Sequence, residues 1–213
     1  MGAAGRSTVA TKEETVMAVS NLVIETIIRR RSIRRYLAQP VPEELLEQIL
    51  TAGLYAPSGG NHQYVRLFVM KDPGRLERLN RELCTAFRQR ELDPSNYQNK
   101  SAVRARAADC HFLFHAPVLI SAVSPREHGN SMADSANALA NMQLAAASLG
   151  LGACWINQPH WMTGCPAVRA IFEEMGMTAG EDIFGSIIVG YPDQTIPAPP
   201  PRKEGRIVRE PEN

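Results

Sequence analysis

Five arginines lie within seven positions of this sequence, around the single serine Ser32: Arg29, Arg30, Arg31, Arg34 and Arg35. The whole chain has a formal net charge of only +1. Basic residues at the C-terminal end of a helix stabilise its dipole by about 0.3–1 kcal/mol each, which accounts for one or two of the five. Because adjacent cations repel, the rest indicate an anionic ligand. A phosphate monoester fits, since its charge and oxygens match the guanidinium fork.

Two other segments carry polar groups suited to ligand binding. In the loop "APSGGNHQ" (56–63), Gly59 and Gly60 allow close approach of the backbone to a flat ligand, and Ser58 and Asn61 offer compact donors and acceptors. The same residues are also typical of an ordinary turn. Near the C-terminus a stiff triple proline precedes a second cationic pair, Arg202 and Lys203, which alone is equally consistent with a solvated tail.

A polar stripe follows the alanine-rich segment 131–150, at steps of three, four and seven residues: Asp134, Asn137, Asn141 and Ser148. The stripe is either a solvated helix face or a row of buried hydrogen-bonding groups, including groups at a subunit interface. Solvated faces usually carry Lys and Glu, which favour helices more than Asn does. Both interpretations remain open at this point.

The hydrophobic pattern predicts the elements that must position these groups. Helical spacing is expected at 14–31, 42–56, 75–91, 131–150 and 166–176, and buried or alternating strands at 64–71, 116–123, 151–157 and within 181–192. Residues 92–108 are expected to form a mobile, partly helical excursion, and the proline-rich tail a brief strand. This alternation predicts one α/β or α+β domain over 20–213, behind a flexible N-terminal arm at 1–19.

Composition excludes several classes of protein. The 213 residues are 44% hydrophobic, as in globular domains. A near-neutral charge argues against binding to nucleic acid or to a membrane, and the sequence contains no apolar run of about 20 residues. The cysteines, Cys84, Cys110, Cys154 and Cys165, form no CxxC pair. They are expected to be reduced thiols of a cytoplasmic protein, without a metal site.

Taken in order, six segments resemble the nitroreductase-like FMN-dependent flavoprotein family: "RRRSIRRY", "APSGGNHQ", "HAPVLISAV", the alanine-rich helix leading into "SLGLGACWIN", "IIVGYP" and a final Arg-Lys. The resemblance covers roughly residues 20–210. It implies an α+β fold with a central, mostly antiparallel sheet flanked by helices. It also implies an intertwined homodimer, with FMN at the subunit interface and a C-terminal extension reaching onto the partner subunit.

The resemblance also implies which residues bind FMN. Its phosphate and ribityl chain would be held by Arg30, Arg31, Ser32 and Arg34, and closed from the tail by Arg202 and Lys203. The other subunit would supply Pro57, Ser58, Gly59 and Asn61. The isoalloxazine ring would lie along Trp155, Ile156 and Asn157.

The activity implied is transfer of a hydride from NADH or NADPH to a small acceptor, such as a nitroaromatic or a quinone, by a ping-pong mechanism. The flavin N5 would carry the hydride, so no catalytic side chain is expected. The wall of the acceptor pocket would come from residues 92–110. Reductive dehalogenation, flavin fragmentation and flavin binding without turnover are the alternatives. A nucleic-acid contact is disfavoured, because "RRRSIRR" lacks interleaved aromatic residues.

Overall fold

A computed structural model describes residues 21–211 of the chain, so the predicted arm at 1–19 lies outside the described residues. The chain divides into two compact units. One contains residues up to Arg30 together with those from Ala198 onward, and the other spans Arg31–Pro197. The larger unit contains the sheet and most of the helices. A single domain over 20–213 stays a prediction.

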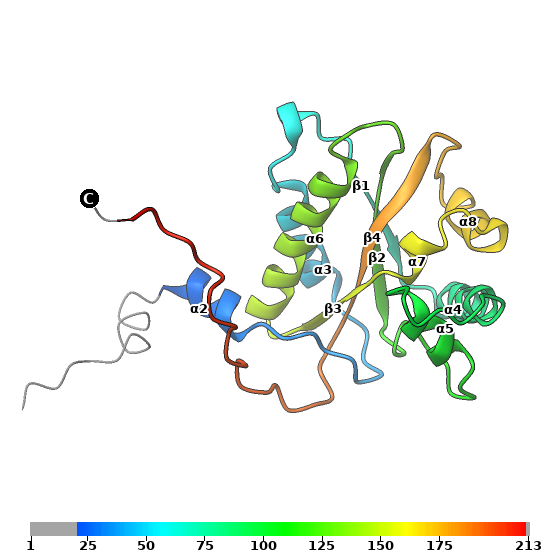
Figure 1. The fold of residues 1–213 in the computed structure, drawn as a ribbon, viewed down its shortest axis with the longest axis horizontal. Helices are drawn as coiled ribbons and strands as arrows, with labels where there is room; N and C mark the ends of the chain where they lie inside the picture. Colours follow the sequence, from blue (N-terminus) through cyan, green and yellow to red (C-terminus); the bar gives the residue numbers. More distant parts are fainter. Residues whose placement is uncertain (1–20, 212–213) are drawn as a thin grey trace, which may run out of the picture. The chain divides into compact units, whose positions relative to one another are not determined.

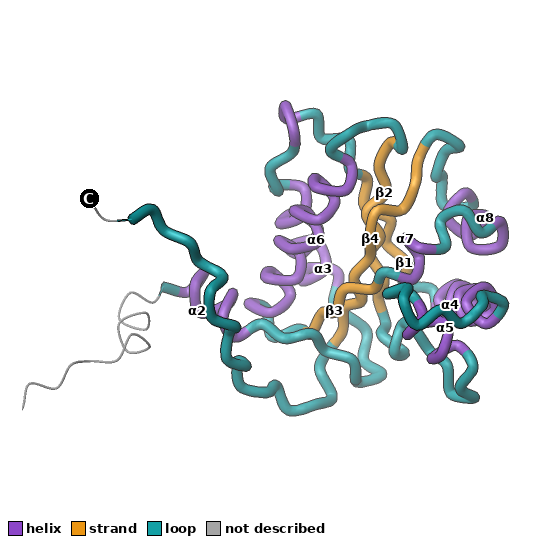
Figure 2. The backbone as a smooth tube through the Cα atoms, viewed as in Figure 1, coloured by secondary structure: helices purple, strands orange, loops and turns teal. Residues whose placement is uncertain are grey.

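Four antiparallel strands form the sheet of the larger unit (Figure 2). Their order across the sheet is β1-β2-β4-β3, and each pair is antiparallel. The register between β2 and β4 shifts at Ala122/Val123. All four strands were predicted from the sequence: β1 (Arg66–Met70), β2 (Val118–Pro125), β3 (Gly152–Ile156) and β4 (Glu181–Gly190). Three lie inside the predicted segments, and β2 extends two residues beyond the predicted end at 123. The predicted mostly antiparallel α+β sheet is therefore confirmed.

Helices lie on both sides of this sheet (Figure 1). One face carries α3 (Glu43–Leu54) and α6 (Ser131–Ser148). The other side carries α4 (Pro73–Arg88), α5 (Asn99–Ala105), α7 (Gln158–Trp161) and α8 (Pro166–Glu173). The sequence predicted all of these except α7, which is a single turn too short to show helical spacing. The partly helical excursion at 92–108 resolves into α5.

Successive residues of each strand point to opposite faces of the sheet, so alternate residues pack into two separate hydrophobic cores. Ile120 and Ile187 pack against Leu139 and Met142 on the α6 side. Their neighbours in the chain, including Ile188, pack on the opposite side with residues of α4 and α8. Because both faces are covered, the central strands are continuous apolar runs rather than alternating ones.

The start of β4 is anchored by an ion-pair network. Arg126 donates two hydrogen bonds to the Asp182 carboxylate, at 2.7 and 3.0 Å, and Arg169 donates another at 3.1 Å. The hydrogen bond from Arg126 is the main reason that the pKa of Asp182 is lowered, against the effect of burial. The preceding residue, Glu181, pairs with Arg66 of β1 at 2.8 Å. These contacts tie the start of β4 to β1, to the residue that follows β2 and to α8.

In the smaller unit, α2 (Leu22–Arg29) begins at Asn21, whose side chain accepts the N–H of Ile24 at 3.0 Å. The helix ends two residues before the predicted end at 31, since Arg30 has extended backbone angles. The predicted start at 14 lies outside the described residues. The prediction of a short strand in the tail is wrong, because residues 198–211 form neither helix nor strand. No helix among residues 21–211 is long and apolar enough to cross a membrane.

One prediction about the cysteines is also wrong. Cys84 of α4 and Cys110, which precedes β2, form a disulfide, whereas Cys154 and Cys165 take no part in one. The pairing has no signature in the sequence, because 26 residues separate the two cysteines and only the packing of α4 brings them together. Disulfides persist mainly in oxidising compartments, so the cysteines do not support the expectation of a reducing environment. The cytoplasmic location stays a prediction.

Candidate functional site

The arginine-rich segment runs in an extended conformation beside the edge of the sheet. Ser32 pairs with Ala153 of the edge strand β3, and the Ile33 N–H donates to the Ala153 carbonyl at 3.0 Å. Further along, Tyr36 pairs with Pro192, just after β4. Only the apolar Ile33 is buried, at 2% exposure. Its anchoring leaves the flanking polar residues on the outside of the segment.

Helix geometry accounts for just one of the five arginines. Arg29 is the only basic residue in the last turn of α2. Arg31 is half-buried at the start of the extended segment, and Arg34 is exposed. Arg35 lies 3.6 Å from Asp193 in an exposed ion pair. The structure therefore brings Arg31, Ser32 and Arg34 together on one segment.

The remaining predicted phosphate ligands belong to the smaller unit. Arg30 follows α2 as its cap, and the tail residues Arg202 and Lys203 are exposed. Their closure over a phosphate held by Arg31, Ser32 and Arg34 stays a prediction.

Tyr36 is a residue that the sequence did not single out. Its hydroxyl donates to the Ile33 carbonyl at 2.6 Å, which closes a short turn containing Arg34. Burial raises the pKa of Tyr36, so it stays protonated and keeps this donor at any physiological pH. A tyrosine three residues after an isolated isoleucine was the only available sign of this contact.

The loop after α3 is held in place by the polar stripe of α6. The Gly59 N–H donates to Asp134 Oδ1 at 3.0 Å, and the Asn137 amide donates to the Pro57 carbonyl at 3.2 Å. The next member, Asn141, donates to Ala52 of α3 at 3.1 Å. The fourth member, Ser148, donates to the Ala145 carbonyl of its own helix at 2.8 Å. The stripe is thus neither a purely solvated face nor shown to be an interface, because all four of its members bond within the chain.

This loop has an unusual backbone. Asn61 and Gln63 each have a φ angle of 53°, and Gly60 has a φ angle of 58°. A Cβ on Gly59 would lie 2.0 Å from the amide nitrogen of the exposed Asn130 side chain, which would have to move aside. Ser58 accepts the Asn61 N–H through its carbonyl at 2.9 Å. The loop lines a small cavity of about 160 Å³, to which Pro57, Ser58, Gln63 and Asp134 contribute.

Aromatic rings continue the loop toward α6. His62 stacks on Tyr64, with centroids 5.2 Å apart, and the His128 ring lies edge-on to both at 5.6 and 4.9 Å. His128 Nε2 lies 3.6 Å from the buried Asp134 carboxylate. The sequence had assigned no role to His62. It gave no sign of His128, which lies more than 60 residues further along the chain.

The predicted flavin-ring residues lie at the end of β3. Trp155 packs on the α6 face, where Gly185 of β4 leaves room for its indole. Its Nε1 donates to Asn157 Oδ1, which orients that amide. The Ile156 side chain, by contrast, is 3% exposed and lies in the core on the opposite face. Of the three, Ile156 can therefore reach a ligand only through its backbone.

These residues fall into two groups at opposite ends of α6. The loop at 57–61 bonds to the first two turns of the helix, whereas the Ser32 segment pairs with the strand that follows it. An 18-residue helix is about 27 Å long, at roughly 1.5 Å per residue. Within one chain, the loop at 57–61 and the Ser32 segment therefore lie toward opposite ends of this helix.

Comparison with known proteins identifies related sequences and structures. The nitroreductase family model matches residues 27–191. YdjA of Escherichia coli K12, named provisionally as an NAD(P)H nitroreductase, is 30% identical over 176 residues, which cover 79% of this chain and 87% of its own. A Methanothermobacter thermautotrophicus protein, named provisionally as an NADH dehydrogenase or NAD(P)H nitroreductase, is 32% identical over 80% of this chain and 77% of its own. A crystal structure of a Bacteroides fragilis nitroreductase with bound FMN is 30% identical, with a TM-score of 0.81 over 90% of this chain and 100% of its own.

Proposed function

The chain belongs to the nitroreductase family, and from this membership we propose that it is an FMN-dependent oxidoreductase. It takes a hydride from NADH or NADPH and passes it to a small acceptor, with nitroaromatics and quinones as the first candidates. The observation that carries the proposal is the extended segment Arg31–Arg34, which presents two guanidinium groups and a hydroxyl beside strand β3. That strand leads directly to Trp155 and Asn157.

The phosphate of FMN is the anion that this segment would bind. Arg31 and Arg34 supply planar donors that match phosphate oxygens, and Ser32 supplies a hydroxyl. Arg30, Arg202 and Lys203 are proposed to complete the set of cations. A side-chain site is needed, since the chain has neither GxGxxG in this segment nor a GxxxxGK[ST] loop.

A second copy of the chain is proposed to complete the site. The loop residues Pro57, Ser58, Gly59 and Asn61 lie at the first two turns of α6, whereas the Ser32 segment pairs with the strand that follows this helix of about 27 Å. We infer that the two groups meet on one FMN when they come from different subunits of a homodimer. The backbone of this loop is already held in place, because Gly59 donates to Asp134 and the Pro57 carbonyl accepts from Asn137.

Residues 155–157 would lie along the flavin ring. Because Asn157 Oδ1 accepts from Trp155, its Nδ2 points away as a donor. A reduced flavin gathers negative charge near N1 and its C2 carbonyl, so donors placed there stabilise the reduced form. The protein then contributes binding, orientation and electrostatics, while bound FMN supplies the hydride chemistry. Donor and acceptor use the same open ring face in turn, which gives ping-pong kinetics.

The proposal is tested by purifying the full-length protein and releasing any flavin by heat. The protein should be yellow, the released flavin should be FMN, and anaerobic NADH or NADPH should bleach it. The double variant Arg31→Ala/Arg202→Ala should lose FMN while keeping its circular dichroism spectrum. Arg81→Ala, an exposed arginine of α4, is the matched control and should retain FMN.

Three results would count against the proposal in different ways. A colourless protein that does not take up added FMN contradicts it entirely. Retention of FMN by the double arginine variant contradicts the phosphate assignment. A yellow protein that neither NADH nor NADPH bleaches is a flavin-binding protein without this activity. Once bleaching is seen, reoxidation by a series of nitroaromatics and quinones identifies the acceptor class.

A further inference from the structure

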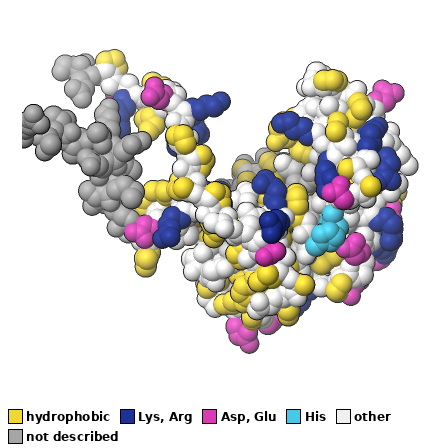
Figure 3. All heavy atoms as spheres, turned by 90° about the horizontal axis from the view of Figure 1, so that it is seen from below, with side chains coloured by type: hydrophobic (Ala, Val, Ile, Leu, Met, Phe, Trp, Pro, Cys, Tyr) yellow, Lys and Arg dark blue, Asp and Glu magenta, His cyan; other side chains and the backbone are white. Residues whose placement is uncertain are grey.

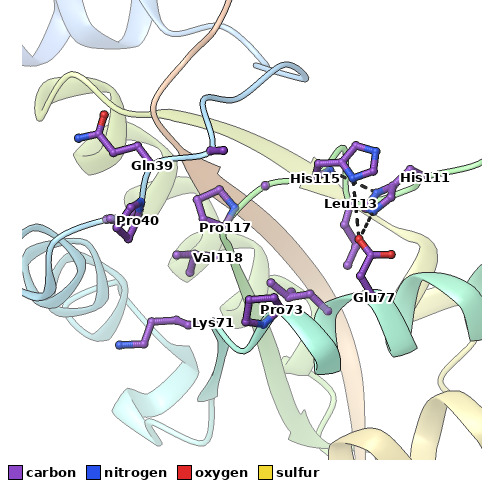
Figure 4. Close-up of a pocket in the computed structure, with 14 residues that line it drawn as sticks. Gln39, Pro40, Lys71, Pro73, Glu77, His111, Leu113, His115, Pro117 and Val118 are labelled. Carbon is purple, nitrogen blue, oxygen red and sulfur yellow. Dashed lines mark hydrogen bonds and ion pairs between the residues drawn. The ribbon is translucent and has the colours of Figure 1, made fainter.

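A carboxylate and two imidazoles meet on the side of the sheet that carries α4. Glu77 projects from α4, and His111 and His115 come from the loop between α5 and β2 (Figure 4). We propose that these three side chains form a binding site for a divalent transition-metal ion, with Zn²⁺ as the best match. No residue of this site belongs to the segments assigned above to FMN, so the proposal goes beyond the proposed function.

The distances between donor atoms suit a tetrahedral ion. Glu77 Oε1 lies 3.0 Å from His111 Nε2 and 3.8 Å from His115 Nδ1. One donor atom from each of the three residues can be chosen so that all lie within 4.8 Å of one another. Ligand atoms about 2.0–2.1 Å from a zinc ion lie roughly 3.4 Å apart in a tetrahedron. The observed separations bracket this value, so small side-chain rotations suffice to bring the ligands onto an ion.

The position of His115 is the feature that hydrogen bonding alone does not explain. Its side chain is 75% exposed, yet its ring lies only 3.6 Å from that of His111. To reach this position, Phe114 and His115 both adopt left-handed backbone angles, with φ of 52° and 54°. Such angles are uncommon for residues other than glycine, more so for phenylalanine than for histidine, and positions of this kind cluster at functional sites. A shared metal ion gives the second imidazole a reason to lie there.

The loop that carries the two histidines is held rigidly against α4. Asn80, one turn after Glu77, accepts the Phe112 N–H at 2.8 Å. The disulfide from Cys84, one turn further, fixes Cys110, the residue immediately before His111. Phe112 and Leu113 are buried in the core. A site whose ligands are fixed by packing and second contacts needs little reorganisation on binding a metal.

The protonation state of His111 also suits a metal ligand. Burial lowers its pKa, and the neighbouring His115 lowers it further, against the opposing effect of the hydrogen bond that His111 donates to Glu77. The neutral imidazole is the form that binds metals. His111 Nδ1 accepts a long hydrogen bond, 3.3 Å, from the His115 N–H, which places the ring proton on Nε2. Coordination through Nε2 gives up this weak contact and the hydrogen bond to Glu77, which becomes a ligand itself.

Three protein ligands leave one position of a tetrahedral ion open. Zinc sites built from two histidines and one glutamate keep a water or a substrate there. Beside the cluster lies a cavity of about 400 Å³, to which Glu77, His111 and His115 contribute together with Lys71, Leu76 and Pro117. The space-filling view from below shows a patch of histidine with acidic side chains beside it (Figure 3). The open position is thus accessible to solvent.

The test uses full-length protein without a histidine tag, stripped of metal with a chelator. Zn²⁺ is titrated calorimetrically, and Co²⁺ is added as a probe whose visible absorption reports tetrahedral coordination. We expect one ion per chain, with affinity at least tenfold weaker in His115→Gln and in Glu77→Gln. His62→Gln and Glu82→Gln are the matched controls: His62 is another exposed histidine, and Glu82 lies on the same helix as Glu77.

The variants at His115 and Glu77 replace exposed side chains, so they should fold like the parent protein, which circular dichroism checks. Absence of Zn²⁺ binding by the parent protein would overturn the proposal. So would binding that the His115 and Glu77 variants leave unchanged, or that the His62 control weakens as much. FMN content is measured in parallel and should not change with either variant. A failure of the metal site is thereby distinguished from a failure of the flavin assignment.

Discussion

Replacement of Gly185 by alanine tests how β3, β4 and α6 are fitted together around Trp155. A Cβ at this position would lie 2.6 Å from Trp155 Cζ2 and 2.7 Å from Leu139 Cδ1. Carbon atoms in favourable contact are about 3.5–4.0 Å apart, so the neighbours must move by roughly 1 Å. Leu139 is fully buried against the sheet, whereas Trp155 is partly exposed. The indole is therefore the group that moves.

The size of the effect follows from the cost of overpacking. Inserting a methyl group into a filled core destabilises a protein by about 1–3 kcal/mol, which for a chain of this length lowers Tm by roughly 2–12 °C. The shift of the indole also disturbs its hydrogen bond to Asn157. If Asn157 binds the flavin ring, loss of one hydrogen bond, about 1 kcal/mol, weakens FMN binding roughly fivefold.

Urea denaturation of the parent protein and of Gly185→Ala measures the change in stability. Gly180→Ala is the matched control: an added Cβ there meets nothing within 4 Å and the backbone is not left-handed. It should be neutral, or stabilising by up to about 1 kcal/mol. Trp155→Phe removes the two Trp155 atoms that clash but not Leu139 Cδ1, so the double variant should recover part of the loss. Equal stability of Gly185→Ala and the control would refute the packing of Trp155 described above.

Three further predictions concern other contacts. Asp182→Asn should flatten the acid limb of the stability curve: because Arg126 lowers the pKa of this carboxyl, its contribution is present above about pH 4 and is lost as the pH falls through the folded-state value. Denaturation at pH 3 to 7 measures it. Cys84→Ser, or a reducing agent, should destabilise the protein by about 3.5 kcal/mol for a 26-residue loop, measured by urea denaturation. Tyr36→Phe leaves the Ile33 carbonyl without its hydroxyl donor and should cost about 1–3 kcal/mol.

The sheet could be predicted from sequence because its central strands are buried on both faces. Continuous β-branched runs such as "APVLISAV" have few alternatives to a buried strand. The boundaries of the helices were less certain. α2 ends at Arg29 because the following residues pair with the sheet edge, a tertiary contact that no local pattern reveals.

Contacts between distant residues were the part that sequence could not supply. The Cys84–Cys110 disulfide and the Glu77–His111–His115 cluster both join α4 to the loop before β2. Glu77 precedes His111 by 34 residues, so the three ligands match no metal-binding spacing. The disulfide and the cluster join the same two segments. The packing that brings the two cysteines together therefore also brings Glu77 close to the two histidines.

The polar stripe of α6 shows why two interpretations of this segment remained open from the sequence. A solvated face and a buried hydrogen-bonding row predict the same spacing of short polar residues, and composition alone favours neither. In the structure Asp134 is buried while Asn137 is exposed, yet both bond to the loop at 57–59. The positions of Asp134 and Asn137 thus match backbone groups of the loop that need hydrogen-bond partners, rather than a face exposed to solvent. Because α6 both fixes this loop and, through Leu139, supports Trp155, it is the element that sets the spacing between the two halves of the proposed flavin site.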